Sequence, residues 1–338
     1  MDSLTQIVLG ASVGEVCLGK KVGNKAPLWG AIAGTIPDLD VLGRGFLDTV
    51  DELHFHRGFT HGIIFCVLFA PVLGWIISKI HKKEPVTWRD WSWLAFWSLL
   101  THPILDCFTT WGTQLFWPLS YRVAWHSIFV VDFIYTVPFM VFLVWAMFKK
   151  KGKSRYKRNL TGLIYSSSFL LLTLLNKVMM QSTFEKEAER QGIVYQDIEV
   201  RPAPVQNVLW TANVKTKEGY YIGYRSFLDK KKSVDFQYFV NNHDLLKPFE
   251  NQEELKRLLF ILKGWYAVEK LSSNKFIIND LRFGLIDGLS GEGKKFVFSY
   301  EMLVNKDGSL SFEQKQYKFG KDVSGSVLTE LWERIKGI

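Results

Sequence analysis

The chain has 338 residues, enough for two ordinary domains, and a formal net charge of +9. This charge does not point to nucleic acid, because the densest basic run, residues 149–158, lies between two long apolar segments, where it is typical of a membrane orientation signal. The three cysteines, Cys17, Cys66 and Cys107, all fall within apolar segments, which excludes a disulfide framework and a cysteine-based zinc knuckle.

Long apolar runs are concentrated in the first half of the chain. The first two, residues 4–18 and 26–36, are short and rich in small residues, and Gly30 and Gly34 are four apart, so they predict tightly packed helices. Four longer runs predict transmembrane spans. They cover residues 61–80, 91–108, 127–148 and 160–180. The fold class predicted for residues 1–180 is therefore a multi-pass α-helical membrane domain.

Basic loops predict how these helices are oriented. Residues 19–25, 81–89 and 149–158 hold the concentrated lysines and arginines, so all three loops are expected to face the cytoplasm. Threading the helices accordingly leaves the chain after Met180 outside the cytoplasm. It also brings one set of histidines and aspartates to the outer ends of their segments. These residues are Asp38, Asp40, His56, His61, His102, Asp106 and His126.

The second half of the chain, residues 181–338, is charged and shows the alternation of β-strands. Six segments enriched in β-branched and aromatic residues predict strands at 208–216, 220–227, 234–240, 275–279, 295–300 and 310–317. Residues 251–262 and 327–335 predict amphipathic helices. We expect a soluble, extracytoplasmic α+β domain, to which the sequence assigns no chemistry.

Two motifs carry paired polar residues with the spacing of metal ligands. His102 and Asp106 are four apart, so on a helix they share one face and can bind one ion together. A polar pair bridging two helices is the alternative, but an unpaired carboxylate within a membrane is costly. Asp38 and Asp40 follow Pro37 in an extended segment. Either could reach a metal, one could orient a ligand histidine, or both could belong to a simple turn.

His56 and His61 complete the set of candidate ligands. Gly58 lies between them, which suggests a loop that wraps round an ion before the next helix begins. Imidazoles and carboxylates together suit zinc, manganese or iron, and more than four ligands leave room for one or two ions that activate a water molecule. The predicted ligands are Asp38, Asp40, His56, His61, His102 and Asp106.

Four further polar residues receive separate interpretations. Arg57, between the two histidines, could hold a phosphate oxygen or simply reach the lipid headgroups. His126 is a candidate ligand or general acid for a leaving group. Asp132, about 9 Å deeper along its helix, is interpreted as a partner for another polar group in the bundle. Glu15 is expected nearer the inner side and is interpreted as structural.

These motifs resemble those of the YdjM/YfhP-like family. The resemblance covers roughly residues 1–150 and rests on residues 1–6 (MDSLTQ), 34–40 (GTIPDLD), 56–62 (HRGFTHG) and 102–106 (HPILD), the last followed by Thr109, Thr110, Trp111 and Gly112. Members are bacterial and archaeal proteins described as inner-membrane-bound, metal-dependent hydrolases. The resemblance implies a multi-pass membrane protein with a metal site built on the Asp-x-Asp, His-x4-His and His-x3-Asp motifs.

The predicted function is a membrane-bound, metal-dependent hydrolase with its site at the outer membrane face. The location among lipid headgroups favours cleavage of a phosphoester in a lipid or lipid-linked envelope substrate by metal-activated water, although an ester or amide could be cleaved similarly. Zinc is the expected divalent ion, and membrane lipids rather than nucleic acid are the expected partners. Two alternatives are a divalent-metal transporter and a membrane anchor with a structural metal and a binding outer domain.

Overall fold

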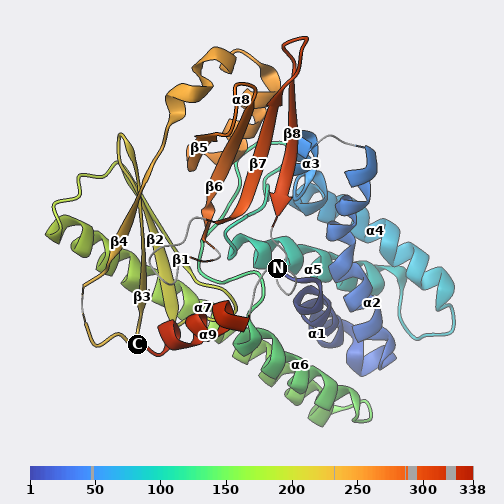
Figure 1. Cartoon of the computed structure of the whole chain (residues 1–338). Helices are drawn as coiled ribbons and strands as arrows, with labels where there is room; N and C mark the ends of the chain where they lie inside the picture. Colours follow the sequence, from blue (N-terminus) through green and yellow to red (C-terminus); the bar gives the residue numbers. More distant parts are fainter. Residues whose placement is uncertain (47–48, 232, 286, 288–294, 317–324, 338) are drawn as a thin grey trace. The chain divides into compact units, whose positions relative to one another are not determined.

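The computed structural model describes residues 1–46, 49–231, 233–285, 287, 295–316 and 325–337, and the chain divides into two compact units (Figure 1). The first unit contains residues 1–46, 55–176 and 204–206 and is helical. The second contains residues 49–54, 177–203 and 207–337 of the described chain, and it carries two antiparallel sheets.

The first two helices pack together through glycines. Asp2 caps the first helix, α1 (Ser3–Val22), by accepting a hydrogen bond from the Thr5 backbone nitrogen, and α2 (Lys25–Thr35) follows after a short turn. A Cβ atom on Gly10 would lie 2.4 Å from the Gly30 carbonyl oxygen, so only glycine permits this approach. The small residues therefore hold α1 and α2 at a very short separation.

In the remainder of the first half, short helices come first and long regular helices follow. Their bounds are η1 (Ile36–Phe46), α3 (Thr49–Phe55), η2 (Phe59–His61), α4 (Ile63–Ile80), α5 (Trp88–Cys107), α6 (Phe133–Met147) and α7 (Lys153–Arg190). Among the described residues, α4 and α7 are long and apolar enough to cross a membrane. The α6 helix is apolar but shorter, with 15 residues.

Three predicted helix boundaries were wrong, each for a local reason. The span expected from Ser127 begins as a helix only at Phe133, because Asp132 caps α6 by accepting from the Tyr135 backbone nitrogen at 2.9 Å. Asp132 is thus a capping residue rather than a group inside the helix. The α5 helix begins before Trp91, since Thr87 and Asp90 form a capping box. The last helix continues beyond Met180 to Arg190.

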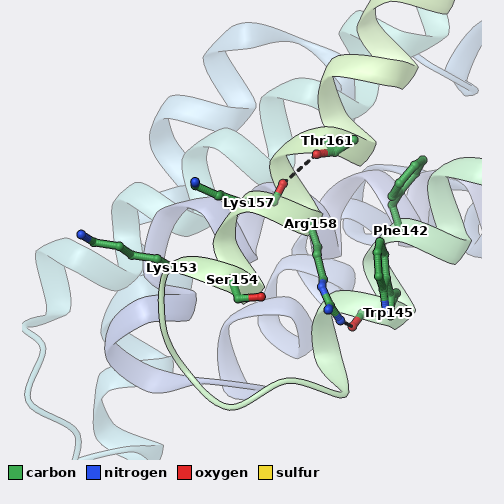
Figure 2. Close-up of a pocket in the computed structure, with 7 residues that line it drawn as sticks. All are labelled: Phe142, Trp145, Lys153, Ser154, Lys157, Arg158 and Thr161. Atoms are coloured by element: carbon green, nitrogen blue, oxygen red, sulfur yellow. Dashed lines mark hydrogen bonds between the residues drawn. The ribbon is translucent and has the colours of Figure 1, made fainter.

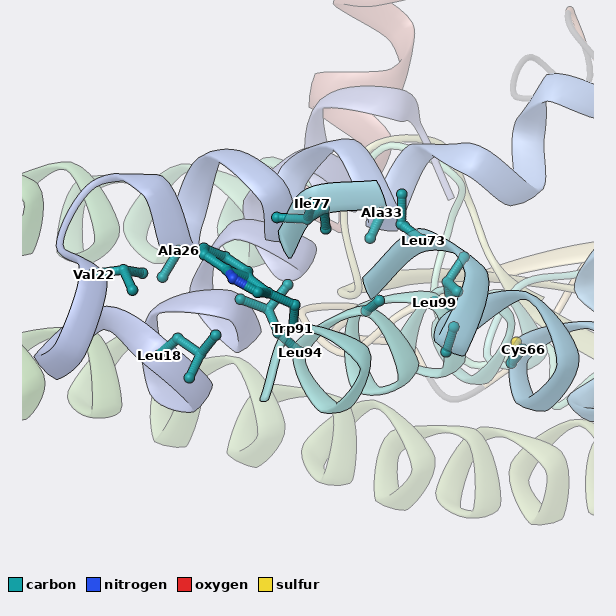
Figure 3. Close-up of a cluster of buried hydrophobic side chains, with 12 residues drawn as sticks. Leu18, Val22, Ala26, Ala33, Cys66, Leu73, Ile77, Trp91, Leu94 and Leu99 are labelled. Atoms are coloured by element: carbon teal, nitrogen blue, oxygen red, sulfur yellow. The ribbon is translucent and has the colours of Figure 1, made fainter. Parts of the chain in front are cut away.

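Apolar side chains from four helices form the main core of the first unit (Figure 3). Trp91 of α5 is fully buried at its centre, beside Leu18 of α1, Ala26 of α2 and Ile77 of α4. A second cluster joins α1 to α5 and α6 through Val8, Leu105 and Phe139. Together the two clusters hold α1, α2 and α5 in contact along the bundle.

The three basic loops of the first unit meet at one end of the bundle. Lys25 forms an ion pair with Glu84, and Lys21 binds Asp90 at 2.9 Å. Lys151 donates to the carbonyl oxygen of Lys21 at 3.0 Å, which brings the third basic segment to the same place. All of these contacts lie at the C-terminal end of α1.

Two four-stranded antiparallel meanders form the second unit. The first contains β1 (Asp197–Pro202), β2 (Leu209–Lys215), β3 (Gly219–Ser226) and β4 (Phe236–Val240), in that order. The short helices η3 (His243–Phe249) and α8 (Glu253–Leu262) follow. The second contains β5 (Tyr266–Lys270), β6 (Lys275–Leu285), β7 (Phe296–Val304) and β8 (Leu310–Gln316), before α9 (Gly325–Ile335).

Six of these strands and both amphipathic helices coincide with predicted segments, whereas β1 and β5 were not predicted. The last predicted strand included Tyr317, which lies outside the described residues. Tyr220, Trp265 and Leu281 belong to one core that joins the two sheets, and Phe184 of α7 packs with Trp210 in another.

Candidate metal centre

Four acidic and imidazole side chains from three elements converge in the first unit. Asp38 comes from η1, His61 from η2, and His102 and Asp106 from α5, where their spacing of four residues places them on one face. Each offers one ligand atom, and the four atoms all lie within 4.8 Å of one another. His61, His102 and Asp106 are buried, while the Asp38 side chain is 25% exposed.

Five of the six distances between the four ligand atoms are nearly uniform. The two Nε2 atoms of His61 and His102 lie 3.2 Å apart. Asp38 Oδ1 lies 3.5 and 3.4 Å from them, and Asp106 Oδ2 lies 3.5 and 3.6 Å from them. Four ligands bound tetrahedrally to zinc at about 2.0–2.1 Å would be about 3.3–3.4 Å apart. These five distances are close to the edges of such a tetrahedron, and the sixth, between the Asp38 and Asp106 oxygens, is at most 4.8 Å.

The ring orientations direct the correct nitrogens towards the centre. His102 Nδ1 lies 2.6 Å from the Gly34 carbonyl oxygen. Because a carbonyl can only accept, Nδ1 must carry the hydrogen, which leaves a lone pair on Nε2 for a metal ion. His61 Nδ1 lies 3.1 Å from the Thr60 hydroxyl and 3.7 Å from Asp40 Oδ2. Polar groups thus stand behind both imidazoles, as in metal sites with supported histidine ligands.

Asp106 is held so that one oxygen is satisfied and the other faces the cluster. Its Oδ1 accepts hydrogen bonds from Gln6 Nε2 at 3.0 Å and from the amino group of Met1. Its Oδ2 is fully buried and has hydrogen-bond geometry with none of the described residues. Arg57 Nε lies 3.2 Å from this oxygen as an ion pair, and the same guanidinium donates to Thr109. A buried carboxylate oxygen that has an ion pair but no hydrogen bond can also bind a metal ion.

The charge state of Asp38 also suits a metal ligand. Burial alone would raise its pKa, but interactions with the adjacent His102 and His61 side chains outweigh this and hold the pKa well below its usual range. The carboxyl group is therefore ionised at neutral pH. Two carboxylates and two neutral imidazoles form a donor set suited to zinc, manganese or iron, so the residues present fit a divalent transition metal.

The structure places the other predicted site residues outside this group of four. Asp40 lies behind His61, where it meets His56 Nδ1 at 3.1 Å and accepts from the Arg57 backbone nitrogen at 2.8 Å. Arg57 is buried against Asp106. His126 lies half-buried between α5 and α6 with a left-handed backbone (φ 51°), and it is not one of the four clustered residues.

Two contributors to the site were not predicted from the sequence. Gln6 is buried and bonds both Asp106 and the His102 carbonyl oxygen, and Thr109 receives the Arg57 guanidinium. In the sequence, Gln6 stands out only as an amide residue within an otherwise apolar helix. Amides and hydroxyls that support ligands are not ligand types themselves, so a search for ligand spacings passes over them.

The helical unit and its buried histidine–aspartate cluster define a protein with a helical domain that carries a candidate metal centre. The sequence profile of the YdjM inner membrane protein family matches residues 1–183, and the chain belongs to this family. It is also similar to inner membrane protein YbcI of Escherichia coli (strain K12), at 32% identity over 137 residues that cover 37% of this chain and 78% of YbcI. No solved structure matches the chain. All four clustered residues lie within the matched range.

Proposed function

We propose that this protein is a multi-pass membrane hydrolase that uses a divalent metal ion held by Asp38, His61, His102 and Asp106. The observation that carries the proposal is the convergence of four ligand atoms within 4.8 Å of one another, with a buried Asp106 oxygen that accepts no hydrogen bond from the described residues. Membership of an inner membrane protein family supports the location. Six helices (α1, α2 and α4–α7) would traverse or enter the membrane in this proposal.

The proposed orientation places the metal centre at the outer membrane face. The basic loops gather at the C-terminal end of α1, whereas Gln6, which bonds Asp106, lies in its first turns. The helix has 20 residues and is therefore about 30 Å long. With the basic end in the cytoplasm, the cluster would lie at the opposite surface, and α7 would lead the C-terminal domain outside the cytoplasm.

The chain's own residues would prepare this site for hydrolysis. When bound, a divalent ion would polarise a substrate oxygen and lower the pKa of a water molecule. Gly34 holds His102 in the tautomer that ligates, and Gln6 fixes the rotation of the Asp106 carboxylate. The exposed edge of Asp38 is where solvent reaches the cluster.

Two predicted catalytic residues take different places in the proposal. Arg57 is bound to Asp106 and Thr109, so we assign it the role of balancing the buried carboxylate charge rather than binding phosphate. His126 remains the proposed general acid. The substrate class, a phosphoester in a lipid or a lipid-linked envelope intermediate, rests on the membrane location.

Metal content and turnover would test the proposal together. The purified protein in detergent would be compared with His61→Ala, Asp106→Ala and the control His81→Ala, whose imidazole bonds Trp29 at the basic end of the bundle. We expect a transition metal in wild type and in the control, lost in both site variants, and metal-dependent release of phosphate or headgroup from phospholipids. Metal retained in both site variants would refute the ligand assignment.

A structural metal with a binding outer domain is a second candidate. Four protein ligands fill the coordination of a structural zinc, whereas catalytic zinc sites keep one position open. Cobalt substitution would distinguish the two, because an added azide ion changes the visible spectrum only where a coordination position is accessible. An unchanged spectrum, with metal bound and no turnover, would favour the structural role.

A divalent-metal transporter is the alternative that would need polar groups through the depth of the bundle, and some do lie further along α1. Ser12 bonds Asn159 at 2.8 Å, and Glu15 binds Arg155 at 2.6 Å, all of them buried. These groups bind one another, which suits a fixed bundle better than an ion pathway. Metal uptake into proteoliposomes, abolished by Asp106→Ala, would instead support transport.

A further inference from the structure

A basic groove lies between α6 and α7 in the first unit, away from the candidate metal centre (Figure 2). It has a volume of about 500 Å³. Two aromatic side chains of α6 form one wall, and the first turns of α7 form the other. The lining residues are Phe142, Trp145, Lys153, Ser154, Lys157, Arg158 and Thr161.

The cations of the groove differ from Arg155 and Lys151 of the same basic run. Arg155 is buried and bound to Glu15, and Lys151 donates to the carbonyl oxygen of Lys21. Lys153, Lys157 and Arg158, by contrast, form no ion pair with any part of the chain that the structure describes. The groove therefore carries three positive charges that are not balanced by described acidic residues, which is a strong field for an anion.

The Arg158 side chain is held in a fixed position. Its guanidinium lies 3.9 Å from the centroid of the Trp145 ring and donates to the Trp145 carbonyl oxygen at 3.4 Å. Figure 2 shows this side chain directed towards Trp145, with Lys153 and Lys157 extending from the neighbouring positions of α7. A stacked guanidinium keeps several N–H groups in a plane that matches phosphate oxygens. Ser154 adds a hydroxyl one turn before Arg158.

In the proposed membrane arrangement, the surroundings of the groove fit the depth of lipid headgroups. Val141 and Val144 of α6 and Ile164 of α7 are exposed apolar side chains on the same two helices. The basic run borders them at the α6–α7 connection, and Trp145 is half-exposed at this border, as is common for aromatic residues at membrane interfaces. Basic pockets between membrane helices on the cytoplasmic side are suited to acidic headgroups.

We propose that this groove binds the phosphate of an anionic phospholipid, with Arg158 and Ser154 contacting the phosphate and Phe142 and Trp145 packing against the glycerol and first acyl carbons. Lys153 and Lys157 supply attraction from the rim. This site is separate from the proposed hydrolase centre and does not depend on its activity.

Native mass spectrometry of the full-length protein in detergent tests the proposal, with phosphatidylglycerol and phosphatidylcholine titrated separately. Each cation near a headgroup contributes about fivefold in affinity. The triple variant Lys153→Gln, Lys157→Gln, Arg158→Gln should therefore lose phosphatidylglycerol binding on the order of 100-fold. The control Lys82→Gln, Lys149→Gln, Lys150→Gln removes the same charge from loops outside the groove and should retain the binding.

Three outcomes would overturn the proposal. An equal loss in the control variant would mean that a diffuse basic surface, not the groove, attracts the lipid. Equal binding of the two lipids by wild type would remove the anion specificity. Displacement of the lipid by inorganic phosphate or glycerol 3-phosphate at similar concentrations would assign the groove to a soluble phosphate ester. If the triple variant does not fold, Arg158→Lys keeps the charge but loses the stacked plane, and wild-type affinity there would equally refute the assignment.

Discussion

Gln6 offers a sharp test of the metal centre, because it supports a ligand without being one. Its side chain is buried and donates to Asp106 Oδ1 at 3.0 Å and to the His102 carbonyl oxygen at 3.3 Å. Replacement by leucine keeps the volume and removes both donors. Groups that support metal ligands typically contribute 10- to 100-fold in affinity, so Gln6→Leu should weaken metal binding by about 1.4–2.7 kcal/mol.

The same substitution should also lower stability, which requires a matched control. Leaving a buried oxygen less satisfied costs about 1–3 kcal/mol. Ser12→Ala removes a buried hydrogen bond to Asn159 from the same helix, away from the metal centre, and should lower the melting temperature without changing metal affinity. Gln6→Glu should bind metal no better than Gln6→Leu in neutral buffer, since a second carboxylate cannot donate to Asp106.

The assay is competition for zinc against a fluorescent chelator, with thermal unfolding measured on the same samples. Wild-type zinc affinity in a folded Gln6→Leu protein would refute the argument that Asp106 is a positioned ligand. Equal losses of metal affinity in Gln6→Leu and Ser12→Ala would show that general destabilisation, rather than ligand positioning, controls the site.

Three further predictions address protonation and packing. Metal affinity should fall as the pH decreases, because protons compete with the metal ion for the imidazole nitrogens of the ligands. Isothermal titration at several pH values would measure this, and a flat profile would exclude imidazole ligands. Arg155→Met should destabilise the protein by about 3–5 kcal/mol, because it leaves Glu15 buried without its partner, and adding Glu15→Leu should recover much of the loss in thermal unfolding. Gly30→Ala should lower the melting temperature sharply, since its Cβ would lie 2.2 Å from the Gly10 carbonyl oxygen; unchanged melting would mean that α1 and α2 separate readily.

The strands of the second unit were largely predictable, because β-branched and aromatic residues alternate along them. β1 was missed because its sequence, DIEVRP, combines three charges with a proline, and β5 because it is short and ends in Glu269 and Lys270. The start of α6 was misplaced because residues 128–131 are as apolar as a helix interior. Because the apolar run continues through the start of α6, hydropathy does not show where the helix begins. The capping hydrogen bond to Asp132 marks that start in the structure.

The candidate site was predictable to the level of residue type. The spacing of His102 and Asp106 guarantees their proximity on a helix, whereas their meeting with Asp38 and His61 depends on how α5 packs against the elements before it. Asp40 and His56 have the same chemistry as the four clustered residues, and distance alone separates the two groups. Residue types therefore indicated which six side chains could bind a metal ion, but they did not show which four of them form the cluster.

The α3 helix links the candidate site to the fold of the second half of the chain. Residues 49–54 belong to the second unit, although the segments on either side carry Asp38 and His61. Within that unit Asp51 pairs with Arg257 of α8, and Val50 and Leu53 are buried. Residues 49–54, between the two ligand-bearing motifs, are therefore held in the second unit by residues far downstream, such as Arg257. A protein cut after α7 would lose Arg257, so truncation should destabilise residues 49–54, which stand in the chain between the segments that carry Asp38 and His61.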